Sequence, residues 1–83
     1  MRLVYFARVR EAIGVDTEEL ALPAEIQTVG NCVDWLAEQG TNYATALADP
    51  SRLRFALDQQ MVWEGTALEG ATELAIFPPV TGG

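Results

Sequence analysis

The last seven residues, 77–83, read Phe-Pro-Pro-Val-Thr-Gly-Gly and offer the clearest chemistry in the sequence. Two consecutive prolines fix an extended backbone and remove two hydrogen-bond donors, so we expect a strand to end there and a tail to leave the domain. From Pro79 to Gly83 an extended chain spans roughly 15–18 Å, enough to enter a deep pocket on another protein.

Glycine suits the tip of such a tail. Gly82 and Gly83 have no Cβ that would block a narrow channel, and a carboxylate on glycine is an unhindered acyl group. If a partner enzyme activates the Gly83 carboxylate, for example by adenylation with ATP, its carbonyl becomes an electrophile for sulfur or nitrogen nucleophiles. The competing interpretation is a frayed terminus without function.

The remaining candidates for chemistry have simpler explanations. Cys32 lies at helical spacing with apolar neighbours, so we expect a core thiol rather than a reactive one. Because the chain has no histidine and one cysteine, a zinc site would need carboxylate ligands alone, and we predict no metal. Arg8 and Arg10 have period-two spacing, which on a strand would place both on one face as a possible carboxylate site.

Two further predictions concern side chains without a chemical role. Glu18 and Glu19 are adjacent on a predicted strand and are expected to point to opposite, solvated faces. Trp35 and Trp63 are expected to be core or half-buried.

Composition limits the classes of function. The 83 residues are 49% apolar, which suits one compact domain, and the net charge is −7 with arginine as the only basic residue type. This charge disfavours nucleic-acid binding and suits either solubility or docking to basic grooves of partner proteins. No segment has the length of a signal peptide core or a membrane span, so we expect a cytoplasmic protein.

The spacing of apolar residues and the positions of glycine and proline along the chain predict an α+β fold. The expected elements are strands at 3–9, 17–22, 54–58, 61–63 and 73–77, short helical turns at 10–14 and 43–48, and one main helix from the cap at Thr28 to Gly40. We expect a mixed sheet with the helix packed on one face. If the first and last strands pair, Val4, Phe6, Ala75 and Phe77 share the other face, as a partner site or as core.

The two ends of the chain resemble the small-subunit family of molybdopterin synthase. The resemblance rests on residues 77–83, on residues 5–14 (Tyr-Phe-Ala-Arg-Val-Arg-Glu-Ala-Ile-Gly) and on residues 74–76. It implies a β-grasp, or ubiquitin-like, fold over residues 1–83, with 78–83 as an extended tail. It also implies a chain that is not an enzyme on its own.

The resemblance further implies a sulfur-carrier mechanism. Gly83 would be adenylated by an activating enzyme of the E1 type and converted to a thiocarboxylate. The tail would then enter the large synthase subunit, in an assembly of two small and two large subunits, and donate sulfur to cyclic pyranopterin monophosphate. No cofactor is expected on the chain itself. The implied partner-binding residues are Phe6, Arg10, Phe77, Pro78, Pro79, Val80 and Thr81, with Gly82 giving access for Gly83.

The sequence departs from this family at two places, and three alternatives stay open. Asp58 stands near where the family usually has an asparagine, and residues 70–72 replace a turn usually rich in aspartate. The alternatives are a sulfur carrier of thiamine biosynthesis, whose tail usually lacks Phe-Pro-Pro, a ubiquitin-like modifier of lysines, and a plain interaction module.

Overall fold

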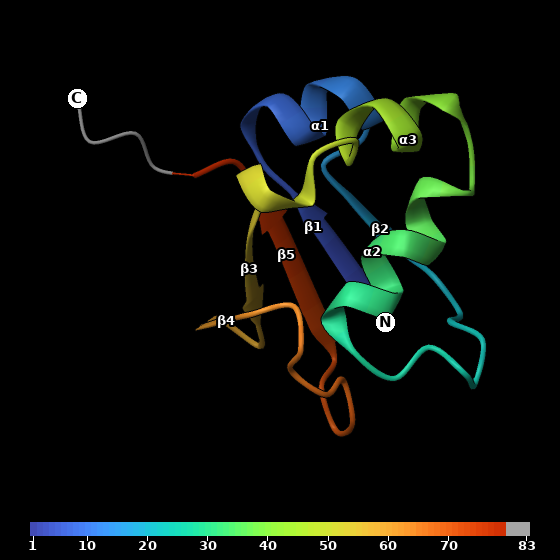
Figure 1. The fold of residues 1–83 in the computed structure, drawn as a ribbon, viewed down its shortest axis with the longest axis vertical. Helices are drawn as coiled ribbons and strands as arrows, with labels where there is room; N and C mark the ends of the chain where they lie inside the picture. The colour runs from blue at the N-terminus through green and yellow to red at the C-terminus, as the bar shows by residue number, and fades with distance from the viewer. Residues whose placement is uncertain (80–83) are drawn as a thin grey trace.

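Five strands form one mixed sheet in the order β2-β1-β5-β3-β4, with three helices on one of its faces (Figure 1). The structure is a computed structural model and describes residues 1–79. Its elements are β1 (Arg2–Tyr5), α1 (Ala7–Ile13), β2 (Thr17–Glu19), α2 (Val29–Ala37), α3 (Thr41–Ala46), the 3-10 helix η1 (Pro50–Arg52), β3 (Arg54–Leu57), β4 (Gln60–Val62) and β5 (Glu73–Phe77). The predicted α+β class is confirmed. Within residues 1–79, every helix is too short or too polar to cross a bilayer.

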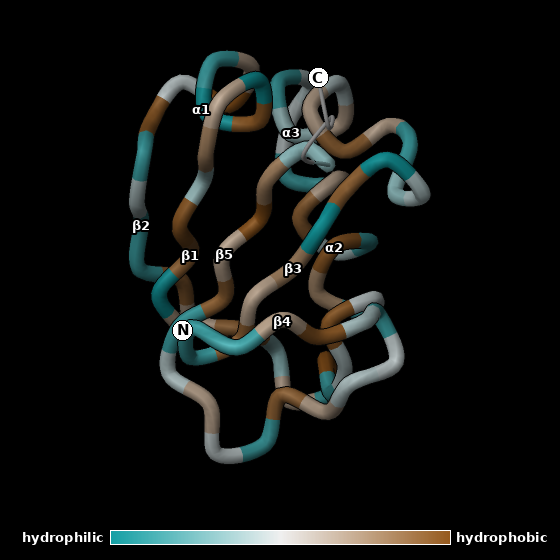
Figure 2. The backbone as a smooth tube through the Cα atoms, turned by 90° about the vertical axis from the view of Figure 1, so that its left-hand side faces the viewer, coloured by the Kyte–Doolittle hydropathy of each residue, from teal (hydrophilic) through white to brown (hydrophobic). Residues whose placement is uncertain are grey.

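The centre of the sheet is a parallel pair of its first and last strands. β1 and β5 pair with Leu3 opposite Leu74 and Tyr5 opposite Ile76, while the other three pairings are antiparallel. These four side chains point to the helical face and are at most 1% exposed. In Figure 2 the strands lie in front and the helices pack above and behind them. The core therefore lies between the central strands and the helices.

Helix α2 begins at the residue that the sequence predicts and ends before the predicted residue, Gly40. The Thr28 hydroxyl accepts a hydrogen bond from the Asn31 N–H at 3.1 Å, which confirms the predicted cap. The predicted left-handed cap at Gly40 is wrong, because the helix ends at Glu38 in the right-handed region and Gly40 has an extended φ of 167°. The Glu38 N–H bonds to the Trp35 carbonyl, which tightens the last turn without a left-handed residue.

The first third of the chain keeps the predicted order of strand, helical turn and strand, and its two strands pair antiparallel, but both are shorter than predicted. The strand expected over 3–9 ends at Tyr5, and the chain turns into helix α1. Val9 and Ile13 explain the helix, since their spacing of four buries both on one helical face. Gly14 ends it with a φ of 101°, as its sequence position predicts. Arg8 and Arg10 therefore do not share a strand face.

The remaining strands follow the sequence pattern closely, and the strand predicted over 73–77 is confirmed at both ends. The strand predicted over 17–22 stops at Glu19, although Leu20 and Leu22 still pack against the core. The strand predicted over 54–58 starts as predicted and ends one residue earlier, at Leu57, and the strand predicted over 61–63 lies one residue earlier, at 60–62. The reason is that Asp58 and Gln59 have positive φ values of 49° and 70° and form the turn between β3 and β4.

A carboxylate that was expected in solvent instead ties three elements together. Glu18 on β2 accepts hydrogen bonds from the hydroxyl of Tyr5 at 2.7 Å and from the hydroxyl of Tyr43 on α3 at 2.8 Å. The prediction that Glu18 is solvated is wrong, because its register opposite Leu3 turns it to the helical face. Burial, then the bond to Glu18, raises the pKa of Tyr5 and of Tyr43 above the usual tyrosine range.

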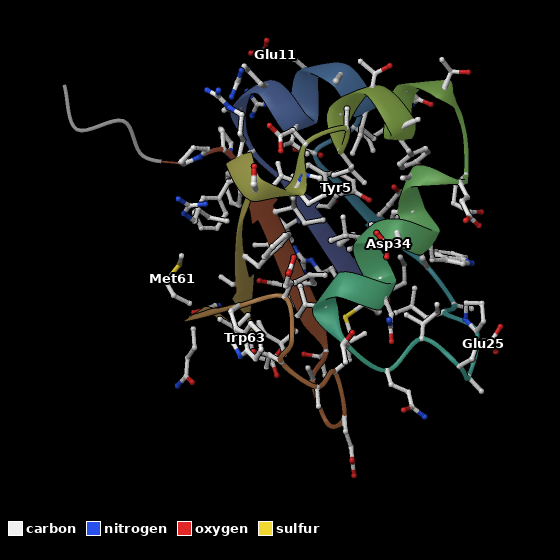
Figure 3. The ribbon with its side chains drawn as sticks, viewed as in Figure 1. Tyr5, Glu11, Glu25, Asp34, Met61 and Trp63 are labelled. Carbon is white, nitrogen blue, oxygen red and sulfur yellow. The ribbon has the colours of Figure 1, made fainter. Side chains whose placement is uncertain are left out.

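The two tryptophans occupy different environments. Trp35 is half-buried against the core, as predicted. Trp63 is 71% exposed, so the prediction of a core or half-buried side chain is wrong for it. Its indole lies across Gly65, where a Cβ would come within 2.3 Å of the ring. The ring therefore rests on bare backbone after β4, at the edge of the sheet (Figure 3).

Replacing Glu18 tests its structural role. In Glu18→Ala the Tyr5 hydroxyl stays buried without its acceptor, which we expect to lower the free energy of unfolding by about 1–3 kcal/mol. Urea denaturation followed by tryptophan fluorescence measures this. The matched control is Glu19→Ala, whose side chain is 75% exposed and should change stability by less than about 0.5 kcal/mol. Equal stability of the two variants would contradict the role given to Glu18.

Candidate functional site

The candidate site is the point where the chain leaves the sheet after β5. Strand β5 is held on both sides, by β1 and by β3, and ends at Phe77 opposite Arg54. Pro78 and Pro79 follow, both half-buried, and neither can donate to a sheet ladder. The predicted end of the strand before the prolines is confirmed. The predicted site residues Val80, Thr81, Gly82 and Gly83 lie outside the described residues.

An aromatic pair stands at this exit. The rings of Phe6 and Phe77 meet edge to face, with centroids 6.1 Å apart and an interplanar angle of 89°. The Phe6 N–H donates to the carbonyl of Ile76 at 3.2 Å, which extends the pairing of β1 with β5 by one residue. Phe6 is nevertheless 47% exposed. Two predicted partner-binding residues are therefore brought together, and nearly half of the Phe6 surface stays open to a partner.

The pair continues into an apolar row on the sheet face opposite the helices. Register places Val4 beside Ala75, Ala75 beside Ala56, and Ala56 beside Met61 on the edge strand β4. The predicted grouping of Val4, Ala75 and Phe77 on this face is confirmed by the pairing, and Phe6 joins it through its contact with Phe77. Ala75 itself is buried, at 7% exposed. Met61 is 62% exposed and points outward beside β4 (Figure 3). The sequence did not predict Ala56 and Met61 here, because their position depends on how β3 and β4 pair.

The two arginines near the start of the chain point to different surroundings. Arg8 lines a hollow together with Pro78, so it lies beside the exit of the tail. Arg10 lines another hollow, with Gly14 and Asp16, on the far side of α1. The structure thus brings Arg8 to the site, whereas the role of Arg10 in partner binding stays a prediction.

The turn that departs from the family pattern is built differently and lies at the other end of β5. The Asp58 carboxylate accepts hydrogen bonds from the N–H groups of Thr72 and Glu73, at 3.0 and 2.9 Å, and from the Thr72 hydroxyl. These bonds lower the pKa of Asp58 below its ordinary value. Gly70, with a φ of 80°, supplies the left-handed residue of the turn. Asp58 therefore fixes the start of β5, while the candidate site lies at its end.

Cys32 does not belong to the site. Its side chain is fully buried in α2, and burial raises the pKa of the thiol to about 11. A thiol at that pKa has almost no thiolate at neutral pH. Among residues 1–79, histidine, cysteine, aspartate and glutamate side chains nowhere gather in threes as a metal site would require.

Comparison with known proteins agrees with this architecture. Residues 3–83 match the model of the ThiS family. The chain belongs to the ThiS family. Over its whole length it is 39% identical to the molybdopterin synthase sulfur carrier subunit of Escherichia coli (strain K12) and 35% identical to that of Haemophilus influenzae, covering 99% of each protein. The resemblance predicted from the two ends is thus confirmed.

Solved structures of similar length share the fold. SAMP1 from Haloferax volcanii superposes with a TM-score of 0.73 at 26% identity, over 100% of this chain and 98% of that one. A putative molybdopterin converting factor, subunit 1, from Pyrococcus furiosus gives 0.71 at 26% identity, over 95% of each chain. The predicted β-grasp fold is confirmed.

The burial of Cys32 predicts low reactivity. In native buffer at neutral pH we expect a disulfide-exchange reagent to modify Cys32 on the order of a hundredfold or more slowly than in denaturant, because reaction requires local or global opening. Absorbance of the released thiolate measures the rate. Rapid modification of the folded chain would contradict the core assignment and return Cys32 to the candidates for chemistry.

Proposed function

We propose that this chain is a sulfur carrier for molybdenum cofactor biosynthesis, with Gly83 as the residue that carries the sulfur. The main support for the proposal is that the chain is 39% identical, over its full length, to a molybdopterin synthase sulfur carrier subunit. The sequence of residues 77–83 gives independent support, because a rigid exit followed by a side-chain-free tip suits delivery of an acyl group into a pocket.

The proposed reaction uses the chain as a carrier in three steps. The Gly83 carboxylate attacks the α-phosphate of ATP in an E1-like activating enzyme, and pyrophosphate leaves. A sulfur donor then displaces AMP from the acyl adenylate, which leaves a thiocarboxylate. In the large synthase subunit the sulfur passes to cyclic pyranopterin monophosphate, and water restores the carboxylate for another cycle.

The domain contributes position rather than catalysis to this scheme. Strand β5 is hydrogen-bonded on both sides, so the tail starts from a fixed point of the fold. Phe6, Phe77 and the row Val4, Ala75, Ala56 and Met61 form an apolar surface beside that point. An aromatic anchor surrounded by apolar contacts is the usual centre of a protein interface. We assign this surface to the large subunit, in an assembly of two small and two large subunits.

A second candidate function has its own support. The fold is shared with a structure named H. volcanii small archaeal modifier protein 1, at a TM-score of 0.73 and 25% identity. A modifier would attach its activated Gly83 to lysines of target proteins. Because this chain has no lysine, it could be attached singly but could not form lysine-linked chains on itself. A thiamine-pathway carrier is the third candidate and shares the activation step.

Charging of Gly83 is the first test. The chain is incubated with ATP, a sulfur donor and the activating enzyme of its host, and its intact mass is measured. We expect the mass shift of one oxygen replaced by sulfur, located at Gly83 by fragmentation. A chain with one residue added after Gly83 is the matched control and should stay uncharged with its fold unchanged. If the wild-type chain is never charged by any host enzyme, the carrier proposal fails.

The aromatic pair predicts a measurable share of large-subunit binding. We expect Phe6→Ala to weaken binding to the large synthase subunit by about 1–2 kcal/mol, or roughly five- to thirtyfold in Kd, because it removes an exposed aromatic anchor. Isothermal titration calorimetry measures this change.

The matched control for Phe6→Ala is Val15→Ala. Val15 is equally exposed, at 44% against 47% for Phe6, and follows α1 away from the apolar surface. Its truncation should leave the Kd within about twofold. Equal effects of the two substitutions would show that the large subunit does not use the aromatic pair.

A further inference from the structure

The sheet topology collects positive charge at the end where the tail leaves. Arg8 and Arg10 follow β1, which ends beside the end of β5. Arg52 and Arg54 stand at the start of β3, which runs antiparallel to β5 and so begins at the same end. Four of the five basic residues of a chain with a net charge of −7 therefore lie at one end of the sheet, where the acidic residues are Glu11, Asp16 and Asp49.

The opposite end of the sheet is acidic. The carboxylates there belong to Glu19, Asp58, Glu69 and Glu73, at the ends or loops of β2, β3 and β5. The fifth arginine, Arg2, lies there too, with its Nε 3.8 Å from Glu73. The amino group of Met1 pairs with Glu19 at 3.2 Å. The cations of both ion pairs within residues 1–79 thus lie at the end of the sheet opposite the tail. The arginines at the tail end form no ion pair within these residues and can interact with solvent or with a partner.

Three of the tail-end arginines surround the start of the tail, and we name Arg8, Arg52 and Arg54 the arginine collar. Arg8 and Arg52 line the same hollow of about 250 Å³ with Pro78, between α1, α3 and η1. Arg54 lies opposite Phe77 in the sheet. Figure 3 shows nitrogen-tipped side chains around the point where β5 leads into the tail.

The collar is partly ordered before any partner binds. The Arg54 Nη1 donates hydrogen bonds to the carbonyls of Leu53 at 2.9 Å and Ser51 at 3.3 Å, which hold its guanidinium beside η1. Asp49 also lines the hollow, and its carboxylate accepts a hydrogen bond from the Ser51 hydroxyl at 2.5 Å. Pre-ordering lowers the entropy lost when a guanidinium forms paired bonds to a carboxylate.

We propose that the arginine collar docks on a carboxylate-bearing rim around the pocket that receives the tail, in the large synthase subunit. This inference rests on the proposed function and adds the chemistry of the partner surface. A chain of net charge −7 is repelled by an acidic rim in most orientations, and the repulsion is weakest in the one that presents the three arginines of the collar. The collar therefore orients the chain tail first during encounter, while the apolar surface supplies the contact that holds the complex.

Association kinetics test the collar. Stopped-flow fluorescence measures binding of the full chain to the large subunit at low and at moderate salt. We expect the triple variant R8A/R52A/R54A to associate about ten- to a hundredfold more slowly than wild type at low salt and to lose or reverse the decrease of the rate with salt. The matched control is Arg2→Ala, which removes one positive charge at the opposite end of the sheet. Its association rate should stay within about twofold of the wild-type rate.

Two further variants separate charge from folding. R8A/R52A removes only side chains that make no hydrogen bond within residues 1–79, so it should fold and still associate more slowly than wild type. The triple arginine-to-lysine variant keeps the charge and should retain most of the association rate. Equal association rates and salt slopes for wild type, R8A/R52A and the triple alanine variant would overturn the collar alone. Failure of the wild-type chain to bind the large subunit would overturn the proposed function, and the collar with it.

Discussion

The parallel pairing of β1 with β5 is the constraint on which the rest of the molecule depends. It brings the first and last strands to the centre of the sheet, with Leu3 and Leu74 fully buried in the core. Because parallel neighbours end at the same edge, the chain leaves β1 into α1 beside the point where β5 leads into the tail. The Phe6–Phe77 pair, the position of Arg8 and the fixed origin of the tail all follow from this one pairing.

The pairing also separates the parts of the molecule that need rigidity from the part that must reach a partner. Burial of the side chains on the helical face and the Glu18 hydrogen bonds fix the sheet and the helices relative to each other. The other face carries the small side chain of Ala56 and the exposed side chain of Met61, which a partner can cover without repacking the core. In this account the partner supplies catalysis, and the β-grasp domain supplies a fixed base for the tail.

Local features of the fold could be predicted from the sequence because each has a local cause. The Thr28 cap, the buried spacing through Leu36, the glycine at Gly14 and the end of β5 before Pro78 follow from neighbouring residues alone. Residues 6–9 were misassigned because a short apolar segment is compatible with a strand and with a helix. A helix forms here because it buries Val9 together with Ile13. The environments of Glu18 and Trp63 were missed because they come from distant segments, through strand register and the bare backbone of Gly65. Arg8 was singled out as a possible carboxylate site, whereas Arg52 and Arg54 were missed because the start of β3 lies beside the tail only in the folded sheet.

The proposed role of the tail is to deliver sulfur to a pterin inside a larger partner. The most direct measurement starts from the chain prepared chemically with a thiocarboxylate at Gly83, mixed with the large synthase subunit and cyclic pyranopterin monophosphate without ATP. We expect formation of the dithiolene product, with two carrier chains returned to the carboxylate for each pterin converted. Full retention of the thiocarboxylate while the two proteins are bound to each other would contradict it.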